Sequence, residues 1–117
     1  MVYDPDNSFA RILRDELPSD RVYEDAEFVA FRNIAPAAPA HIVVIPRGEP
    51  PASPSGLSES DSQWVGRMVV VATRVAVEQG LVADGYRLVI NNGANAGQSV
   101  EHLHLHILGG GRLGPIA

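Results

Sequence analysis

Three histidines alternate with apolar residues near the end of the chain, in the segment His102-Leu-His104-Leu-His106-Ile-Leu108. Successive side chains of a strand point to opposite faces, so this spacing places the imidazoles on one face and the aliphatic side chains on the other. The chain contains four histidines, and the fourth, His41, opens the apolar segment HIVVI. We therefore expect the histidines to supply any chemistry that this protein performs.

This histidine segment has three interpretations: the polar face of a half-exposed strand, a metal site, or a nucleophilic site acting on phosphorus. The spacing argues against a metal site for all three histidines, because a rise of about 3.3 Å per residue puts His102 and His106 roughly 13 Å apart. Since a zinc–nitrogen bond is only ~2.0 Å long, these two rings could share one ion only almost collinearly. A neutral imidazole is a good nucleophile near neutral pH, because its unperturbed pKa is about 6.5.

A glycine-rich segment, Gly93-Ala-Asn-Ala-Gly97-Gln98-Ser99, directly precedes the histidines. Glycines there allow backbone N–H groups to turn toward an anion, and Ser99 adds a hydroxyl. Such loops are common in proteins and indicate little alone. Next to three histidines, the loop favours the interpretation as a nucleophilic site that handles phosphate.

The residue types that are missing exclude several classes of enzyme. The 117 residues include no cysteine and no lysine, because all nine basic residues are arginine. Thiol nucleophiles, thiolate metal sites, Schiff-base enzymes and Walker-type phosphate loops are therefore excluded. A net charge of −5 argues against nucleic acid or an anionic membrane as a partner. The sequence has no apolar run of ~18 residues and no signal peptide, so we expect a cytoplasmic protein.

The sequence predicts one α+β domain over residues 1–117. A short helix is expected with Ser8 as its cap, Phe9, Ile12, Leu13 and Leu17 at helical spacing, and Pro18 as its stop. Strands are predicted over residues 21–25, 28–33, 41–45, 86–91 and 99–108, with a turn at 25–27 and irregular segments at 34–40 and 47–56.

A long helix is predicted from about Glu59 to Gln79, with a capping box at 58–61 and Gly80 as its terminating residue. Its main apolar stripe comprises Trp64, Val65, Met68, Val71, Ala72, Val75 and Ala76, and Val69, Val70 and Val77 widen it. A helix that is apolar nearly all round is buried on more than one side. We therefore expect a homodimer, the alternative being scattered exposed valines.

The segment 97–110, GQSVEHLHLHILGG, resembles the signature of the histidine triad (HIT) nucleotide hydrolases and transferases, H-x-H-x-H followed by apolar residues. Ser99 and the Leu-Gly-Gly after the triad are similar to the Hint branch, whereas the dinucleoside polyphosphate hydrolase branch usually has Thr and Pro there. The resemblance continues upstream through segments 9–18, 31–41 and 86–93 and covers nearly the whole chain. It implies the HIT fold, a five-stranded, mainly antiparallel sheet with one long and one short helix, as a dimer.

The resemblance also implies catalytic roles. His104, the middle histidine, would attack the α-phosphorus and become a nucleotidyl-histidine. His106 and Ser99 would contact phosphate oxygens, with Ser99 near the leaving group. His102 and His41 would orient and polarise the nucleophile.

The substrate-binding residues that the resemblance implies fall into three groups. Asn91, Gly97 and Gln98 would line the phosphate and ribose site, and Asn33 and Ile34 would contact the ribose and base. Phe9, Ile12 and Leu17 would form the wall of the purine pocket, although plain core positions explain these three equally well.

Three features depart from the family pattern. Asn33 stands where the family usually has Asp, so the ribose diol loses a charged acceptor. The segment after Pro46 is Arg-Gly-Glu-Pro-Pro rather than a basic run with a His, and the tail 112–117 lacks the Trp that Hint proteins often send across the dimer. These departures bear on the leaving group rather than on the chemistry.

Together, the residues and the resemblance predict a homodimer that hydrolyses purine nucleoside 5′-phosphoramidates through His104, with no metal and no other cofactor. One alternative is a dinucleoside polyphosphate hydrolase of the same fold. The other is a nucleotide-binding or scaffold protein without catalysis.

Overall fold

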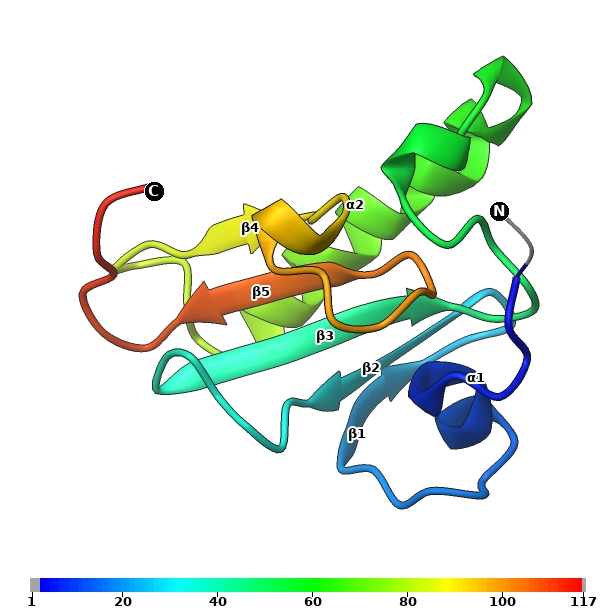
Figure 1. Ribbon diagram of the computed structural model, residues 1–117. Helices are drawn as coiled ribbons and strands as arrows, with labels where there is room; N and C mark the ends of the chain where they lie inside the picture. The colour runs from blue at the N-terminus through cyan, green and yellow to red at the C-terminus, as the bar shows by residue number, and fades with distance from the viewer. Residues whose placement is uncertain (1–2, 117) are drawn as a thin grey trace.

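The computed structural model describes residues 3–116 and shows one sheet with helices on both sides (Figure 1). The elements are α1 (Ser8–Leu13), β1 (Arg21–Glu24), β2 (Phe28–Arg32), β3 (Ala40–Pro46), α2 (Ser62–Glu78), β4 (Arg87–Val89) and β5 (Leu105–Gly109). Short 3₁₀ turns occupy Pro54–Gly56, Glu59–Asp61 and Ala94–Ala96. The strand order is β1-β2-β3-β5-β4, with every neighbouring pair antiparallel. The predicted α+β class and five-stranded sheet are confirmed.

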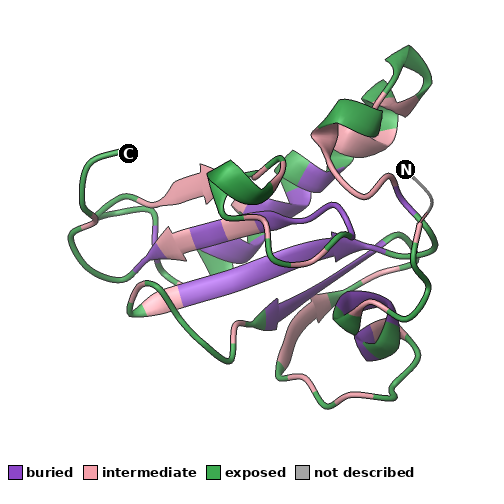
Figure 2. Ribbon diagram, in the orientation of Figure 1, coloured by how far each residue is buried: buried purple, intermediate pink, exposed green. Residues whose placement is uncertain are grey.

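Each face of the sheet has its own apolar core. On one face, α2 packs Met68, Val75 and their neighbours against Leu103, Leu105 and Ile107. On the other face, α1 contributes Phe9 and Ile12, which pack on side chains of β2 and β3. The central strands β2 and β3 are consequently buried on both faces, whereas β1 and β4 at the two edges are less buried (Figure 2).

The last strand is shorter than predicted. The sequence indicated a strand over 99–108, but β5 begins at Leu105, which pairs with Val44 of β3. The cause lies in Pro46 at the end of β3. The N–H of Arg47 points to β2, where it donates to the Glu27 carbonyl, so the backbone of Pro46 faces β5. Proline has no N–H to donate, and the β3–β5 ladder stops there.

The first helix also differs from its prediction. Asn7, not Ser8, caps α1, because its Oδ1 accepts the Ala10 N–H at 2.9 Å. The helix ends at Leu13, since Asp15 adopts a left-handed φ of 59° and the Glu16 N–H returns to the Arg11 carbonyl. Leu17 therefore lies outside the helix, but it still packs on the apolar core beside α1.

The long helix follows its prediction closely. Ser58 donates its N–H to Asp61 Oδ2 at 2.8 Å in a capping box, and a 3₁₀ turn leads into α2. Beyond the helix, Gly80 has a φ of +72° and the Leu81 N–H bonds the Ala76 carbonyl. No helix within residues 3–116 has the length and apolar character needed to cross a membrane.

Candidate active site

The histidine segment lies where β5 begins. His106 is inside β5, opposite Val43 of β3 and Val89 of β4, whereas His102 and His104 precede the strand. The alternation holds: Leu103, Leu105 and Ile107 enter the core under α2, and the imidazoles lie on the opposite face. The interpretation of the histidines as the polar face of a half-exposed strand does not hold, because His102 is 0% and His104 is 4% exposed. Phe9 of α1 covers the rings on this face.

His104 is held by the backbone of its own segment. Its Nδ1 lies 2.6 Å from the His102 carbonyl, and a carbonyl only accepts, so Nδ1 carries the proton. Burial lowers the pKa of His104 from its usual 6.5, so the ring is neutral at neutral pH. In the neutral ring one nitrogen is a donor and the other an acceptor. The lone pair of His104 therefore resides on Nε2, which is the form that a nucleophile needs.

His102 is anchored at both of its nitrogens. Its Nε2 donates to the Pro46 carbonyl at 2.8 Å, and its Nδ1 accepts from the Tyr3 hydroxyl at 2.6 Å. Burial lowers the pKa of His102 to about 4, and burial also raises the pKa of Tyr3 above 10.0. At neutral pH the imidazole is therefore neutral, and the hydroxyl keeps the proton that it donates.

His41 and His106 form a second chain of hydrogen bonds. The Ala37 N–H donates to His41 Nδ1 at 2.9 Å, which places the His41 proton on Nε2. That proton is donated to His106 Nδ1, also at 2.9 Å, so the proton of His106 resides on its Nε2. Burial, followed by the neighbouring His104 and His41, lowers the pKa of His106 to about 4. The Nε2–H of neutral His106 is thus a hydrogen-bond donor that carries no positive charge.

This second chain shows which ring His41 contacts. His41 was expected to orient the nucleophile His104, but its ring nitrogens bond Ala37 and His106. The rings of His104 and His106 meet edge to face with centroids 4.9 Å apart. His41 therefore contacts His106 rather than His104. The ring of His104, with its lone pair on Nε2, lies directly beside the ring of His106, whose Nε2 is a hydrogen-bond donor.

A cavity of about 230 Å³ adjoins the histidines on the α1 side. Its lining comprises Ser8, Phe9, Ile12, Leu17, Pro18, Ser19, Phe31, Arg32, Asn33 and Ile34. Phe9 joins it to the triad, because its ring contacts His104 at 4.8 Å between centroids. The five residues that sequence reasoning put at the base and ribose thus converge on one mostly apolar cavity.

Asn33 is largely committed to the protein. Its Oδ1 accepts the Ala35 N–H at 2.8 Å, so it caps the turn that follows β2. Its Nδ2 lies 3.4 Å from His41 Nε2. The side chain therefore offers a ligand mainly N–H rather than a free oxygen.

The side chain of Gln98, which the resemblance assigned to the ligand, instead stabilises the glycine-rich loop. The Gln98 amide oxygen accepts the Gly93 N–H, and its nitrogen donates to the carbonyls of Ala52 and Val100. The side chain thus fixes the conformation of the loop, and both of its amide N–H groups already donate to backbone carbonyls. Gly97, with a φ of +85°, and Ser99 are exposed, and Asn91 is half-buried.

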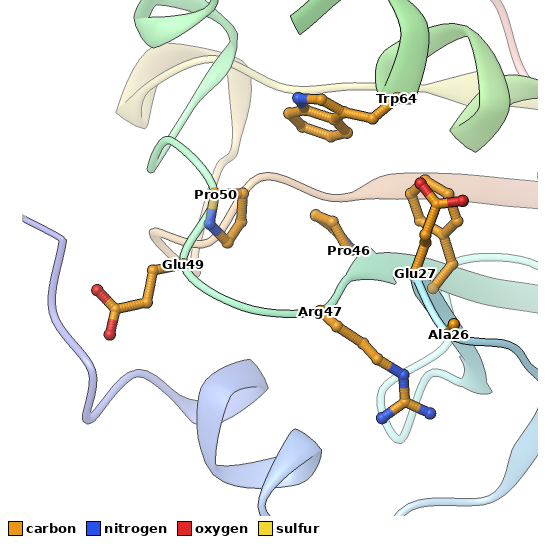
Figure 3. A pocket seen from close by; sticks show the side chains of 8 residues that line it. Ala26, Glu27, Pro46, Arg47, Glu49, Pro50 and Trp64 are labelled. Atoms are coloured by element: carbon orange, nitrogen blue, oxygen red, sulfur yellow. The ribbon is translucent and has the colours of Figure 1, made fainter.

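Pro46 separates the triad from a different hollow. Its carbonyl accepts a hydrogen bond from His102 Nε2. Its ring borders a cavity of about 320 Å³ that Trp64 and Pro50 also line (Figure 3). Neither cavity is lined by a histidine, but Phe9, which lines the cavity beside α1, contacts the His104 ring. The cavity beside α1 is therefore the one that reaches the triad.

Residues 14–113 match the HIT domain. The chain belongs to the HIT family. It is 45% identical over 108 residues to the purine nucleoside phosphoramidase of Escherichia coli, which covers 92% of this chain and 90% of that protein. Among solved structures, a HIT family hydrolase from Clostridium thermocellum is 41% identical with a TM-score of 0.88, covering 94% of this chain and 95% of that one. A histidine triad protein from Clostridium difficile is 35% identical with a TM-score of 0.90, covering 99% and 100%. The predicted HIT fold is confirmed.

Several functional contacts of this HIT protein escaped sequence reasoning. Three of them are backbone groups, which the residue types in the sequence do not reveal: the carbonyls of Pro46 and His102 and the N–H of Ala37. Tyr3 lies outside the region that matches the HIT domain and 99 positions from its partner. The only signal for Tyr3 is that an aromatic hydroxyl stands in an otherwise polar segment.

The buried imidazoles of this HIT protein predict a pH dependence of stability. The folded state holds the pKa of His102 and His106 at about 4, whereas free imidazoles titrate near 6.5. Below 6.5 the unfolded chain therefore binds protons that the folded site does not accept. The contribution of the two neutral imidazoles to the free energy of unfolding is therefore complete above pH 6.5. It decreases as the pH falls from 6.5 to about 4, the folded-state pKa. Thermal midpoints measured across this window check the slope, and His106→Gln makes it shallower. A midpoint that stays constant down to pH about 4 contradicts the prediction.

Proposed function

We propose that this HIT protein hydrolyses purine nucleoside 5′-phosphoramidates through a covalent nucleotidyl-histidine on His104. The observation that carries the proposal is the hydrogen bond from His104 Nδ1 to the His102 carbonyl, which leaves the Nε2 lone pair free. Among residues 3–116, no side chain or backbone group hydrogen-bonds that Nε2. The name of the 45% identical Escherichia coli protein supports the choice of substrate class.

The reaction has two steps. In the first, His104 Nε2 forms a bond to phosphorus while the phosphorus–nitrogen bond to the amine breaks, and the departing amine takes up one proton. In the second, water attacks phosphorus, the histidine leaves, and one proton is released. The sum consumes one water and yields a nucleoside monophosphate and an amine.

The neighbours of His104 fit the needs of these steps. The Nε2–H of His106 is a donor for a phosphate oxygen, and preorganised donors of this kind stabilise charge that develops in a transition state. Exposed Ser99 and the amides near Gly97 supply further donors at the leaving-group side. The apolar cavity beside α1 takes the purine, with Phe9 between the base and the nucleophile.

The first test removes the nucleophile. Loss of a general acid or base typically costs ~10²–10⁴-fold in rate, and His104→Ala is expected to exceed that loss. Because His104 is buried against Phe9, a second variant, His104→Asn, keeps a side-chain N–H for the His102 carbonyl. Turnover of an AMP amide and trapping of the nucleotidyl-protein are measured for both. The assignment fails if either variant keeps a tenth of the activity while His102→Ala or His106→Ala is inactive.

The same assay identifies the leaving group. AMP amides, diadenosine polyphosphates and nucleotide sugars are compared at equal concentration. Preference for the amides supports the phosphoramidase. Preference for diadenosine substrates instead assigns the polyphosphate alternative, and no turnover of any of them assigns a binding or scaffold role.

Homodimerisation is part of the proposal, and exposed apolar side chains support a surface for it. Met68 is buried in the core of the single chain, so the contact is made by exposed Val69, Val70 and Val77 of α2 and by Ile90 beyond the edge strand β4. A two-fold axis would place these patches against their copies. Sedimentation is expected to show no 12.5 kDa species at micromolar concentration, and Val70→Glu is expected to produce one. A stable wild-type monomer refutes the dimer.

Asn33 tests the ribose contact. Asn33→Asp keeps an oxygen for the Ala35 N–H and adds a second, charged oxygen in place of Nδ2. Charge-assisted hydrogen bonds are about twice as strong as neutral ones, so AMP affinity is expected to rise by about 1 kcal/mol, or about fivefold. Affinity for 2′,3′-dideoxy-AMP is expected to change little. Equal changes for both ligands remove Asn33 from the ribose site and leave it with the turn alone.

A further inference from the structure

Tyr3 reaches the buried side of the triad from a segment 99 positions away. Its hydroxyl lies 2.6 Å from His102 Nδ1, and the two rings meet at 61° with centroids 5.6 Å apart. The segment that carries it is fastened beside α1. Arg14 donates Nη1–H to the Pro5 carbonyl at 2.8 Å, and Asn7 Nδ2 donates to the Asp4 carbonyl at 2.8 Å.

The direction of the Tyr3 hydrogen bond follows from its neighbours. The Pro46 carbonyl obliges His102 Nε2 to carry the proton, so neutral His102 has its lone pair on Nδ1. Tyr3 is therefore the donor. Since His102 is 0% exposed, removing this hydroxyl leaves a buried acceptor without a partner. Leaving such a group unpaired is costly, so the ring must turn or admit water.

Movement of His102 would be transmitted to the nucleophile. The carbonyl of the same residue accepts the Nδ1–H of His104 at 2.6 Å. Tyr3 and His104 are thus linked through one residue: the ring of His102 is hydrogen-bonded by Tyr3 and Pro46, and its backbone carbonyl by His104. Hydrogen bonds that orient a catalytic histidine fix its tautomer and direction.

We propose that Tyr3 is a positioning residue of the reaction: it donates to His102 Nδ1, holds that residue against Pro46, and so aims the His104 Nε2 lone pair. Tyr3 does not touch the substrate. The proposal rests on His104 being the nucleophile. It adds a contact from outside the region that matches the HIT domain.

The experiment compares two phenylalanine variants. Tyr3→Phe removes the hydroxyl and keeps the ring beside His102. Tyr23→Phe is the matched control, because its hydroxyl donates to Asp25 Oδ2, also at 2.6 Å and part-buried, on β1 away from the triad. Loss of one such hydrogen bond corresponds to about fivefold. We expect Tyr3→Phe to slow single-turnover formation of the nucleotidyl-protein from an AMP amide about fivefold with KM unchanged, and Tyr23→Phe to leave this rate unchanged.

A second measurement does not depend on activity. In nitrogen-15 spectra of the imidazoles, the His102 Nδ1 signal is expected to move in Tyr3→Phe toward that of a nitrogen without a hydrogen bond, and to stay in place in Tyr23→Phe. An unchanged His102 signal, or equal slowing by both variants, overturns the role of Tyr3. If His104→Asn retains turnover, the nucleophile assignment fails instead, and the nitrogen-15 result still reports whether Tyr3 donates to His102.

Discussion

Each buried imidazole of this protein carries a single proton, and the rest of the site depends on where that proton resides. A neutral imidazole has one donor and one acceptor, and neither can be left unpaired inside a protein without cost. Two chains of hydrogen bonds begin at backbone groups whose polarity cannot change. The Ala37 N–H sets His41 and then His106, and the Pro46 carbonyl sets His102. The His102 carbonyl holds the proton of His104 on Nδ1 and so leaves a lone pair on Nε2, whereas the chain from Ala37 places a donor on His106 Nε2. An imidazole lone pair and an N–H donor thus lie side by side without a buried charge, which would cost far more free energy to maintain.

The fold supplies two of these backbone groups, the carbonyls of Pro46 and His102, through an interruption in its sheet. Pro46 ends the ladder between β3 and β5 because it lacks the N–H that the next pair needs. The backbone before Leu105 is thereby released from the sheet, and the unpaired Pro46 carbonyl is available to His102. A regular strand through 99–108 would have used that carbonyl and that of His102 in ladder bonds. The interruption that shortens β5 is therefore what allows two histidines to bond backbone oxygens instead.

The sequence predicted the parts of this arrangement that depend on local pattern. Alternation in the histidine segment correctly assigned Leu103, Leu105 and Ile107 to the core under α2. The capping box and Gly80 correctly bounded the long helix. The pairing of His41 with His106 could not be predicted, since it depends on the β3–β5 register, which sets Val43 opposite His106 and leaves His41 diagonal to it on the same face. Gln98 was assigned to the ligand by resemblance, whereas its side chain bonds Gly93 and Val100 nearby and Ala52 of a distant loop. Tertiary contacts of this kind leave no periodic signal in the chain.

The side-chain amide of Asn33 is consistent with the proton positions assigned to His41 and His106. Its oxygen is used by the Ala35 N–H, so the group that faces His41 Nε2 at 3.4 Å is an NH₂, which accepts nothing. His41 therefore has one acceptor for its Nε2 proton, His106 Nδ1. The neutral side chain keeps the direction of the hydrogen-bond chain from Ala37 to His106 unambiguous, because it offers the His41 proton no second acceptor. The tautomer of His106 is therefore fixed by His41 alone.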